Sequence, residues 1–91
     1  MAHPALRVTF VDDATAYRQW DAFGDSLADR VSGFASGFAR KRDGASYVVL
    51  LRDLPESQAH QIATWCGRQS GVVTVVAIAE PEFWASPSNA V

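Results

Sequence analysis

Residues 31–52 read VSGFASGFARKRDGASYVVLLR, and this stretch decides the fold. Its dipeptide Asp43-Gly44 is a strong signal for a two-residue hairpin turn, because both residues tolerate the positive φ angles that such turns need. The run over residues 45–52 is apolar and rich in β-branched side chains, which is typical of a strand. Before the turn, two glycines within eight residues disfavour a helix. We therefore predict a β-hairpin with strands over residues 31–42 and 45–52.

The position of the turn fixes which side chains share a face of the hairpin. With the turn there, Phe38 lies opposite Val49, and side chains two residues apart point to the same face. One face has small residues beside Val48 and Leu50, which leaves room for a helix with bulky side chains such as Trp20. The other, bulky face consists of Phe34, Phe38, Tyr47, Val49 and Leu51.

Upstream of the hairpin, the chain predicts one strand and one helix. Residues 6–11 alternate apolar and polar side chains, with the period of a half-buried strand. Residues 16–30 repeat apolar side chains at intervals of three and four, which predicts an amphipathic helix. Asp12 and Asp13 come just before it, where a carboxylate accepts the free N–H groups of the first turn. These adjacent carboxylates are also a candidate acid/base pair, but capping explains them without a further assumption.

Downstream, the pattern predicts a second helix and a last strand. Pro55 suits the first turn of a helix, and Gly71 is the predicted stop signal, with Gly67 as an earlier alternative. Residues 72–79 form a strongly β-branched strand. The order strand, helix, strand, strand, helix, strand predicts an α+β domain with a ferredoxin-like βαββαβ fold. Its four-stranded antiparallel sheet has the order 4-1-3-2, with both helices on one face.

Length and composition limit what kind of protein this is. The chain has 91 residues, of which 48% are hydrophobic and 20% charged, so it forms one folded domain and not a disordered segment. We predict that residues 1–80 form this domain and that residues 81–91 form a proline-containing C-terminal tail. No apolar run approaches the ~20 residues of a membrane span, so we expect a cytoplasmic protein without a membrane partner.

The predicted sheet has more apolar side chains than two helices cover. Whichever face the helices take, the other keeps several large apolar residues, and such a patch is unusual on a soluble monomer. We expect another protein chain, a second copy or a different protein, to cover that face, with the chain's own tail as the alternative. The leading prediction is a protein-interaction module: a homodimer, or a subunit or inhibitor that docks on another protein. Its expected interface residues are Phe34, Phe38, Val49, Leu51, Phe83 and Trp84.

The sequence shows no cluster of residues that metal or covalent chemistry requires. Its two histidines, His3 and His60, are far apart in the chain, and Cys66 falls on the opposite side of its helix from His60. Cys66 lies on an apolar stripe, where a cysteine packs as a small hydrophobe. We therefore expect no catalytic residues, no metal and no cofactor. The net charge of −2 argues against a nucleic-acid partner.

The alternative prediction is a small dimeric enzyme without a cofactor, or a small-molecule-binding domain of the same topology. Its pocket would be lined by Tyr17, Tyr47 and His60. An enclosed cavity of at least ~300 Å³ with converging polar groups would distinguish this alternative from an interaction module, whose core is filled.

Overall fold

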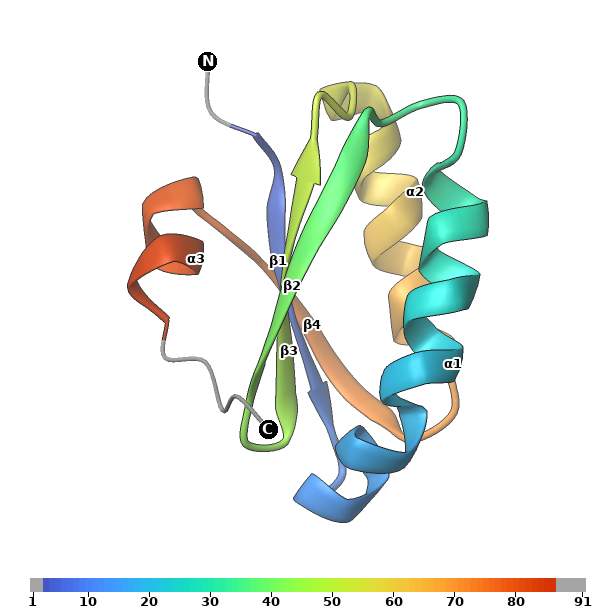
Figure 1. Cartoon of the computed structure of the whole chain (residues 1–91), viewed down its shortest axis with the longest axis vertical. Helices are drawn as coiled ribbons and strands as arrows, with labels where there is room; N and C mark the ends of the chain where they lie inside the picture. The colour runs from blue at the N-terminus through green and yellow to red at the C-terminus, as the bar shows by residue number, and fades with distance from the viewer. Residues whose placement is uncertain (1–2, 87–91) are drawn as a thin grey trace.

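Three helices and four strands follow one another in the computed structural model, which describes residues 3–86 (Figure 1). The strands form one sheet in the order β2-β3-β1-β4, which reads β4-β1-β3-β2 from its other edge, and all neighbours are antiparallel. The α+β class and the four-stranded antiparallel sheet are thereby confirmed. The elements are β1 (Ala5–Phe10), α1 (Asp13–Val31), β2 (Gly37–Asp43), β3 (Ser46–Arg52), α2 (Glu56–Gly67), β4 (Val72–Ile78) and α3 (Glu80–Ala85).

The helices divide between the two faces of the sheet. Helices α1 and α2 cover one face, and α3 lies against the other (Figure 1). Helix α1 is capped by Asp12, whose carboxylate accepts the N–H of Thr15 at 2.7 Å. This hydrogen bond lowers the pKa of Asp12, since it favours the charged form of the carboxyl group. The capping role expected of Asp12 is confirmed.

The first strand of the predicted hairpin is shorter than the sequence analysis expected. Helix α1 continues to Val31, and the N–H groups of Phe34 and Ala35 both donate to the Val31 carbonyl at 3.0 Å. Gly33 takes a φ of 87° in this turn. The prediction of a strand over residues 31–36 is therefore wrong, and Phe34 lies in the connection between α1 and β2 and not on the sheet.

The hairpin register differs from the predicted one by two residues. Phe38 pairs with Leu51 and not with Val49, because the loop consists of Gly44 and Ala45 and not of Asp43 and Gly44. Gly44 supplies the positive φ, 61°, at the first loop position, as a type II′ turn requires. A shift of two residues leaves every side chain on its original face, so the grouping of the two faces is preserved.

The core lies between the sheet and the helices α1 and α2. Tyr47 is fully buried there, and its ring contacts those of Phe10, Trp20 and Phe23 at centroid distances of 4.6, 5.1 and 5.2 Å. The Tyr47 hydroxyl donates a hydrogen bond to the Ala16 carbonyl of α1. The bulky face of the hairpin is thus the face under the helices, since only this face has aromatic side chains that can join those of α1 and β1.

Candidate interaction site at strand β4

Four of the six predicted interface residues come from the α1–β2 connection and the hairpin. Val49 and Leu51 are buried in the core beneath α1 and α2, which corrects their assignment to an uncovered face. Phe38 is half-buried against the same core. Phe34 is 50% exposed, away from the other three. The structure therefore does not bring these residues together on one accessible surface.

The other two predicted interface residues belong to α3. Phe83 is buried against Ala5, Val48 and Leu50, so the chain's own C-terminal segment covers the apolar part of the second face. Trp84 remains exposed, with its Nε1 donating to Glu80 Oε2 at 3.0 Å. Residues 81–85, expected to be part of a tail, thus form most of α3, which packs on the sheet; residues 87–91 lie outside the described part of the chain.

Beside α3, the part of the second face formed by β1, β2 and β3 is polar. Arg7 forms an ion pair with Asp43 at 3.2 Å, and the hydroxyl oxygens of Thr9 and Ser46 lie 2.9 Å apart. These side chains come from β1, β2 and β3, beside the patch that α3 covers. Val76 of β4, which pairs with Arg7, is exposed at the edge of this face. Within residues 3–86, β1, β2 and β3 add no broad apolar surface to it.

The three residues predicted to line a pocket lie in different surroundings. Tyr17 is exposed on α1, with its ring centroid 5.8 Å from the Arg42 guanidinium carbon. Tyr47 is buried in the core, and His60 is exposed on α2. The structure does not bring these side chains together, so they line no common cavity.

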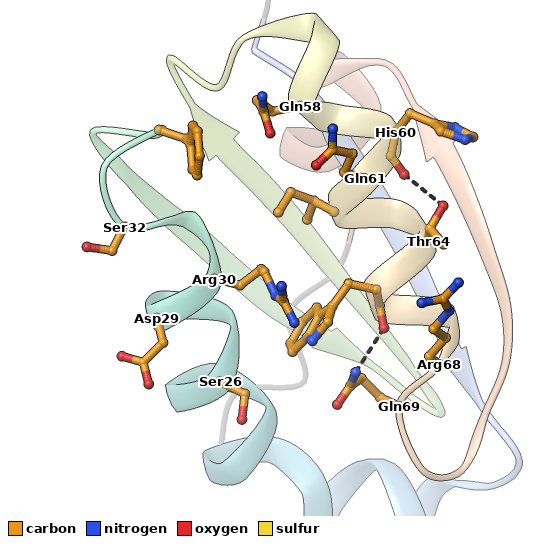
Figure 2. Close-up of a pocket in the computed structure, with 13 residues that line it drawn as sticks. Ser26, Asp29, Arg30, Ser32, Gln58, His60, Gln61, Thr64, Arg68 and Gln69 are labelled. Atoms are coloured by element: carbon orange, nitrogen blue, oxygen red, sulfur yellow. Dashed lines mark hydrogen bonds between the residues drawn. The ribbon is translucent and has the colours of Figure 1, made fainter.

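A groove of about 920 Å³ runs between α1 and α2 (Figure 2). Arg30 lies inside it, with its guanidinium carbon 5.4 Å from the Trp65 ring centroid. Asp29 and His60 point away from the groove in opposite directions (Figure 2). The groove is open to solvent, and its ionisable side chains do not converge as an acid/base pair requires.

A second groove, of about 870 Å³, lies where β4 ends and α3 begins. One side is formed by the first turns of α2, and the floor by the adjoining ends of β1 and β4. Its walls are mainly apolar, so it continues the apolar character of β4 towards α2. The apolar residues that line it are Pro4, Ala5, Leu6, Leu54, Pro55, Ala59, Ala63, Ala77, Ile78, Ala79 and Pro81.

Strand β4 forms one edge of the sheet and has no charged residue. Its sequence is VVTVVAI, and it pairs with β1 on its inner side. Val73 and Val76 are 58% and 53% exposed, which makes them two of the six large exposed hydrophobic residues described. Among residues 3–86, no strand pairs with its outer side. An edge of this kind presents free N–H and C=O groups beside apolar side chains.

The opposite edge, β2, has the charges that β4 lacks. Arg40 lies over the Trp20 ring at 3.8 Å, Lys41 donates to carbonyl groups of α3, and Arg42 donates to the Gly44 carbonyl at 3.2 Å. Charged side chains on an edge strand hinder pairing with another chain. Of the two edges, therefore, only β4 has the chemistry of a pairing site.

The described residues form no metal site and no reactive thiol site. Within residues 3–86, no group of three or more His, Cys, Asp or Glu side chains is placed to hold a metal ion. Cys66 is buried, and this burial raises its pKa to about 12, which keeps the thiol protonated. None of the helices in this part of the chain combines the length and apolarity needed to cross a membrane.

We expect Cys66 to resist thiol reagents in the folded protein. At pH 8 its thiolate fraction is on the order of 10³-fold below that of a free cysteine, because its pKa is about 12 instead of 9.0. The thiolate is the reactive form, so labelling slows in proportion. Labelling with a pyridyl disulfide, followed by absorbance, should be slow in buffer and fast in about 6–8 M urea, which unfolds the protein. Rapid labelling of the folded protein would show that Cys66 is accessible and that the core differs from the one described.

Comparison of the chain with models of protein families, with curated proteins and with solved structures finds no match. What the protein does must therefore be inferred from the chemistry of its own residues.

Proposed function

We propose that this protein is a small interaction module that forms a homodimer by pairing β4 with β4 of a second copy. In this proposal the domain is a cytoplasmic, ferredoxin-like βαββαβ unit to which α3 is added. The observation that carries it is the contrast between the two edges of the sheet: β4 is uncharged and exposed, whereas β2 has three consecutive basic residues. Native proteins protect edge strands from pairing, and an unprotected one marks a place where pairing is used.

The sequence of β4 suits pairing with itself. A two-fold axis at Val75 places Val72 opposite Ile78 and Thr74 opposite Val76 of the second copy. All of these side chains are uncharged, so no like charges meet. Strand β2 fails the same test, because a two-fold axis at Arg40 would set equal charges directly opposite each other, which is destabilising.

Helix α2 adds surface to such a pair. Antiparallel pairing about this axis joins the two sheets edge to edge with their helices on the same side, so the two α2 helices become neighbours. A Cβ atom at Gly67 would lie 3.8 Å from Val75 Cγ2, which places this side of α2 beside β4. Ala63 and Ala59, four and eight residues before Gly67, are also small, so two helices can approach closely. Pairing of strands alone buries little, and a stable interface needs roughly 1,200 Å² or more.

The test is the mass of the protein in solution. Light scattering after size exclusion should give twice the chain mass of 9.9 kDa. Val76→Lys should weaken association by about 100-fold or more, because it buries a charge in the interface and sets two ammonium groups diagonally across the strand pair. The matched control is Phe34→Lys, which places the same charge on a side chain of similar exposure in the α1–β2 connection. This control should remain a dimer.

Two results would contradict the proposal. One is a mass of a single chain for the unmodified protein at concentrations of about 1 mM, which is far above the dissociation constant of a specific dimer. The other is an equal dissociation constant for the unmodified protein and Val76→Lys, which would place the interface away from β4. Amide hydrogen exchange locates the contact independently, since pairing should slow exchange in residues 72–78 of the dimer.

A further inference from the structure

Helix α3 conceals an apolar patch on the second face of the sheet. Phe83 is its buried side chain, and it contacts Ala5, Val48 and Leu50, with Ala39 and Ile78 packed against the same group. Figure 1 shows α3 alone on this side, apart from α1 and α2. A helix of six residues is not stable by itself in water, so α3 keeps its structure only while it is docked.

Lys41 on β2 binds the C-terminal end of α3 through hydrogen bonds. Its Nζ donates to the carbonyl oxygens of Phe83, Ser86 and Trp84 at 2.9, 3.2 and 3.4 Å. It also lies 4.7 Å from the centroid of the Phe83 ring and 5.7 Å from that of Trp84. The last carbonyl groups of a helix lack partners within it and have a partial negative charge, so one ammonium group satisfies several of them at once.

Within residues 3–86, α3 has two other hydrogen bonds to the rest of the domain, one near each end. Arg7 donates to Ser86 Oγ at 3.4 Å while it is paired with Asp43. At the N-terminal end, the backbone N–H of His3 donates to Glu80 Oε1 at 2.8 Å, and this bond lowers the pKa of Glu80 together with the stronger effect of the Trp84 indole. Apart from Phe83, no side chain of α3 is buried. Docking of α3 therefore depends mainly on Phe83 and Lys41.

We infer that α3 is a latch, fastened by Lys41, that opens as a unit while the rest of the domain stays folded. Opening uncovers the apolar patch of Ala5, Val48 and Leu50 and frees Phe83 and Trp84 together. The part of the second face beneath α3 is thus an exposed apolar patch in the open state and covered in the closed one, and the charge of Lys41 sets the balance between them. This inference does not depend on the pairing of β4.

Amide hydrogen exchange of the full chain tests the latch. Residues 80–86 should exchange through local opening, about 100-fold or more faster than the β3 amides, which require global unfolding. Lys41→Gln removes the charge and should speed exchange in residues 80–86 about tenfold, the loss expected when a charged hydrogen-bond donor is removed. Exchange in β3 should stay within about twofold of its original rate, which also shows that the variant is folded.

Arg42→Gln is the matched control, since it removes the neighbouring positive charge, which bonds to Gly44 and not to α3. It should leave the exchange of residues 80–86 unchanged. The inference is overturned if α3 and β3 exchange at the same rate, because α3 would then open only when the whole domain unfolds. It is equally overturned if Lys41→Gln and Arg42→Gln have the same effect on α3. Neither outcome bears on the dimer, whose test is the mass of the protein.

Discussion

Replacement of Tyr47 by alanine should lower the free energy of unfolding by about 3–5 kcal/mol, the range found when a fully buried aromatic side chain is truncated. Tyr47 lies at the centre of the core, where its ring contacts Phe10, Trp20 and Phe23. Loss of the ring leaves a cavity among side chains from β1 and α1, which pack around it in the core. Because domains of this size are stable by about 5–10 kcal/mol, the variant should be close to unfolding at 25 °C.

Urea denaturation followed by tryptophan fluorescence measures this loss of stability. Two further variants separate the contribution of the buried ring from that of the hydroxyl and from that of an exposed tyrosine. Tyr47→Phe keeps the ring and removes only the hydroxyl that donates to Ala16, so it should cost about 1 kcal/mol. Tyr17→Ala removes an exposed tyrosine and should change stability by less than about 0.5 kcal/mol. If Tyr47→Ala does not fold, Tyr47→Phe still tests whether Tyr47 is buried with its hydroxyl bonded to Ala16. A loss of stability for Tyr17→Ala equal to that for Tyr47→Phe would contradict this placement of Tyr47.

The same tyrosine predicts how stability changes at alkaline pH. Burial raises the pKa of Tyr47 to about 12 from 10.0. Folding therefore favours the neutral phenol, and this contribution is complete below pH 10 and is lost as the pH rises through about 12. Stability of the unmodified protein should fall more steeply between these values than that of Tyr47→Phe. Parallel curves for the two proteins would show that the hydroxyl is accessible to water.

Gly71→Ala is expected to have the second largest effect, a loss of about 2–5 kcal/mol. Gly71 has a φ of 85°, which costs other residues about 1–2 kcal/mol. A Cβ atom there would also lie 2.5 Å from Cγ2 of Thr15, a buried residue in the first turn of α1. The Gly71 carbonyl accepts the N–H of Val11 at 2.9 Å, so the turn has little freedom to move. Overpacking adds about 1–3 kcal/mol to the cost.

Two other glycines separate the backbone effect from the steric one. Gly33 has a φ of 87° with no atom within 4 Å of its Cβ position, so Gly33→Ala should show only the backbone cost. Gly37 has neither a positive φ nor a neighbour at its Cβ position, so Gly37→Ala should be close to neutral. Urea denaturation should rank the losses as Gly71, then Gly33, then Gly37. Equal losses at Gly71 and Gly33 would show that Thr15 is not in contact with Gly71.

Local signals in the sequence were sufficient for most elements of the fold. The structure has the strand predicted from the alternation in β1 and the helix predicted from the three- and four-residue spacing in α1. The carboxylate of Asp12 caps that helix, as expected. The tetrapeptide Ser-Gly-Phe-Ala, in contrast, occurs twice, at residues 32–35 and 36–39, and adopts two different structures. Its first copy ends a helix and its second begins β2, because hydrogen bonds to Val31 and pairing with β3 fix them differently. The four-residue pattern itself indicates neither these hydrogen bonds nor this strand pairing.

The sequence grouped the two faces of the hairpin correctly but did not show which face lies under α1 and α2. The sequence predicts that the small-residue face with Ala39 admits a helix with bulky side chains such as Trp20, but Trp20 packs on the other face, against Tyr47. The small-residue face instead takes a single aromatic residue, Phe83, from a helix of six residues. Such a helix is too short for its periodicity to be visible in the sequence, so α3 was expected to be a tail.

The candidate site at β4 was missed because the prediction considered the faces of the sheet and not its edges. Sequence signals for it existed: the predicted order 4-1-3-2 already placed the last strand at an edge, and residues 72–79 have no charge. What the sequence did not contain is the position of the basic residues of β2, which the structure shows engaged with Trp20 and α3. Only that contrast distinguishes an open edge from a protected one.

The central position of β1 has a consequence for how the protein is made. Strand β1 pairs with β4, the last strand of the sheet, since Ala5 lies opposite Ile78, and with β3 through Leu50. Contacts between residues so distant in the chain form slowly. The sheet cannot close until β4 has been synthesised, and until then one edge of β1 has no partner strand. During translation, this chain should therefore depend on protection by chaperones more than a helical domain of equal length.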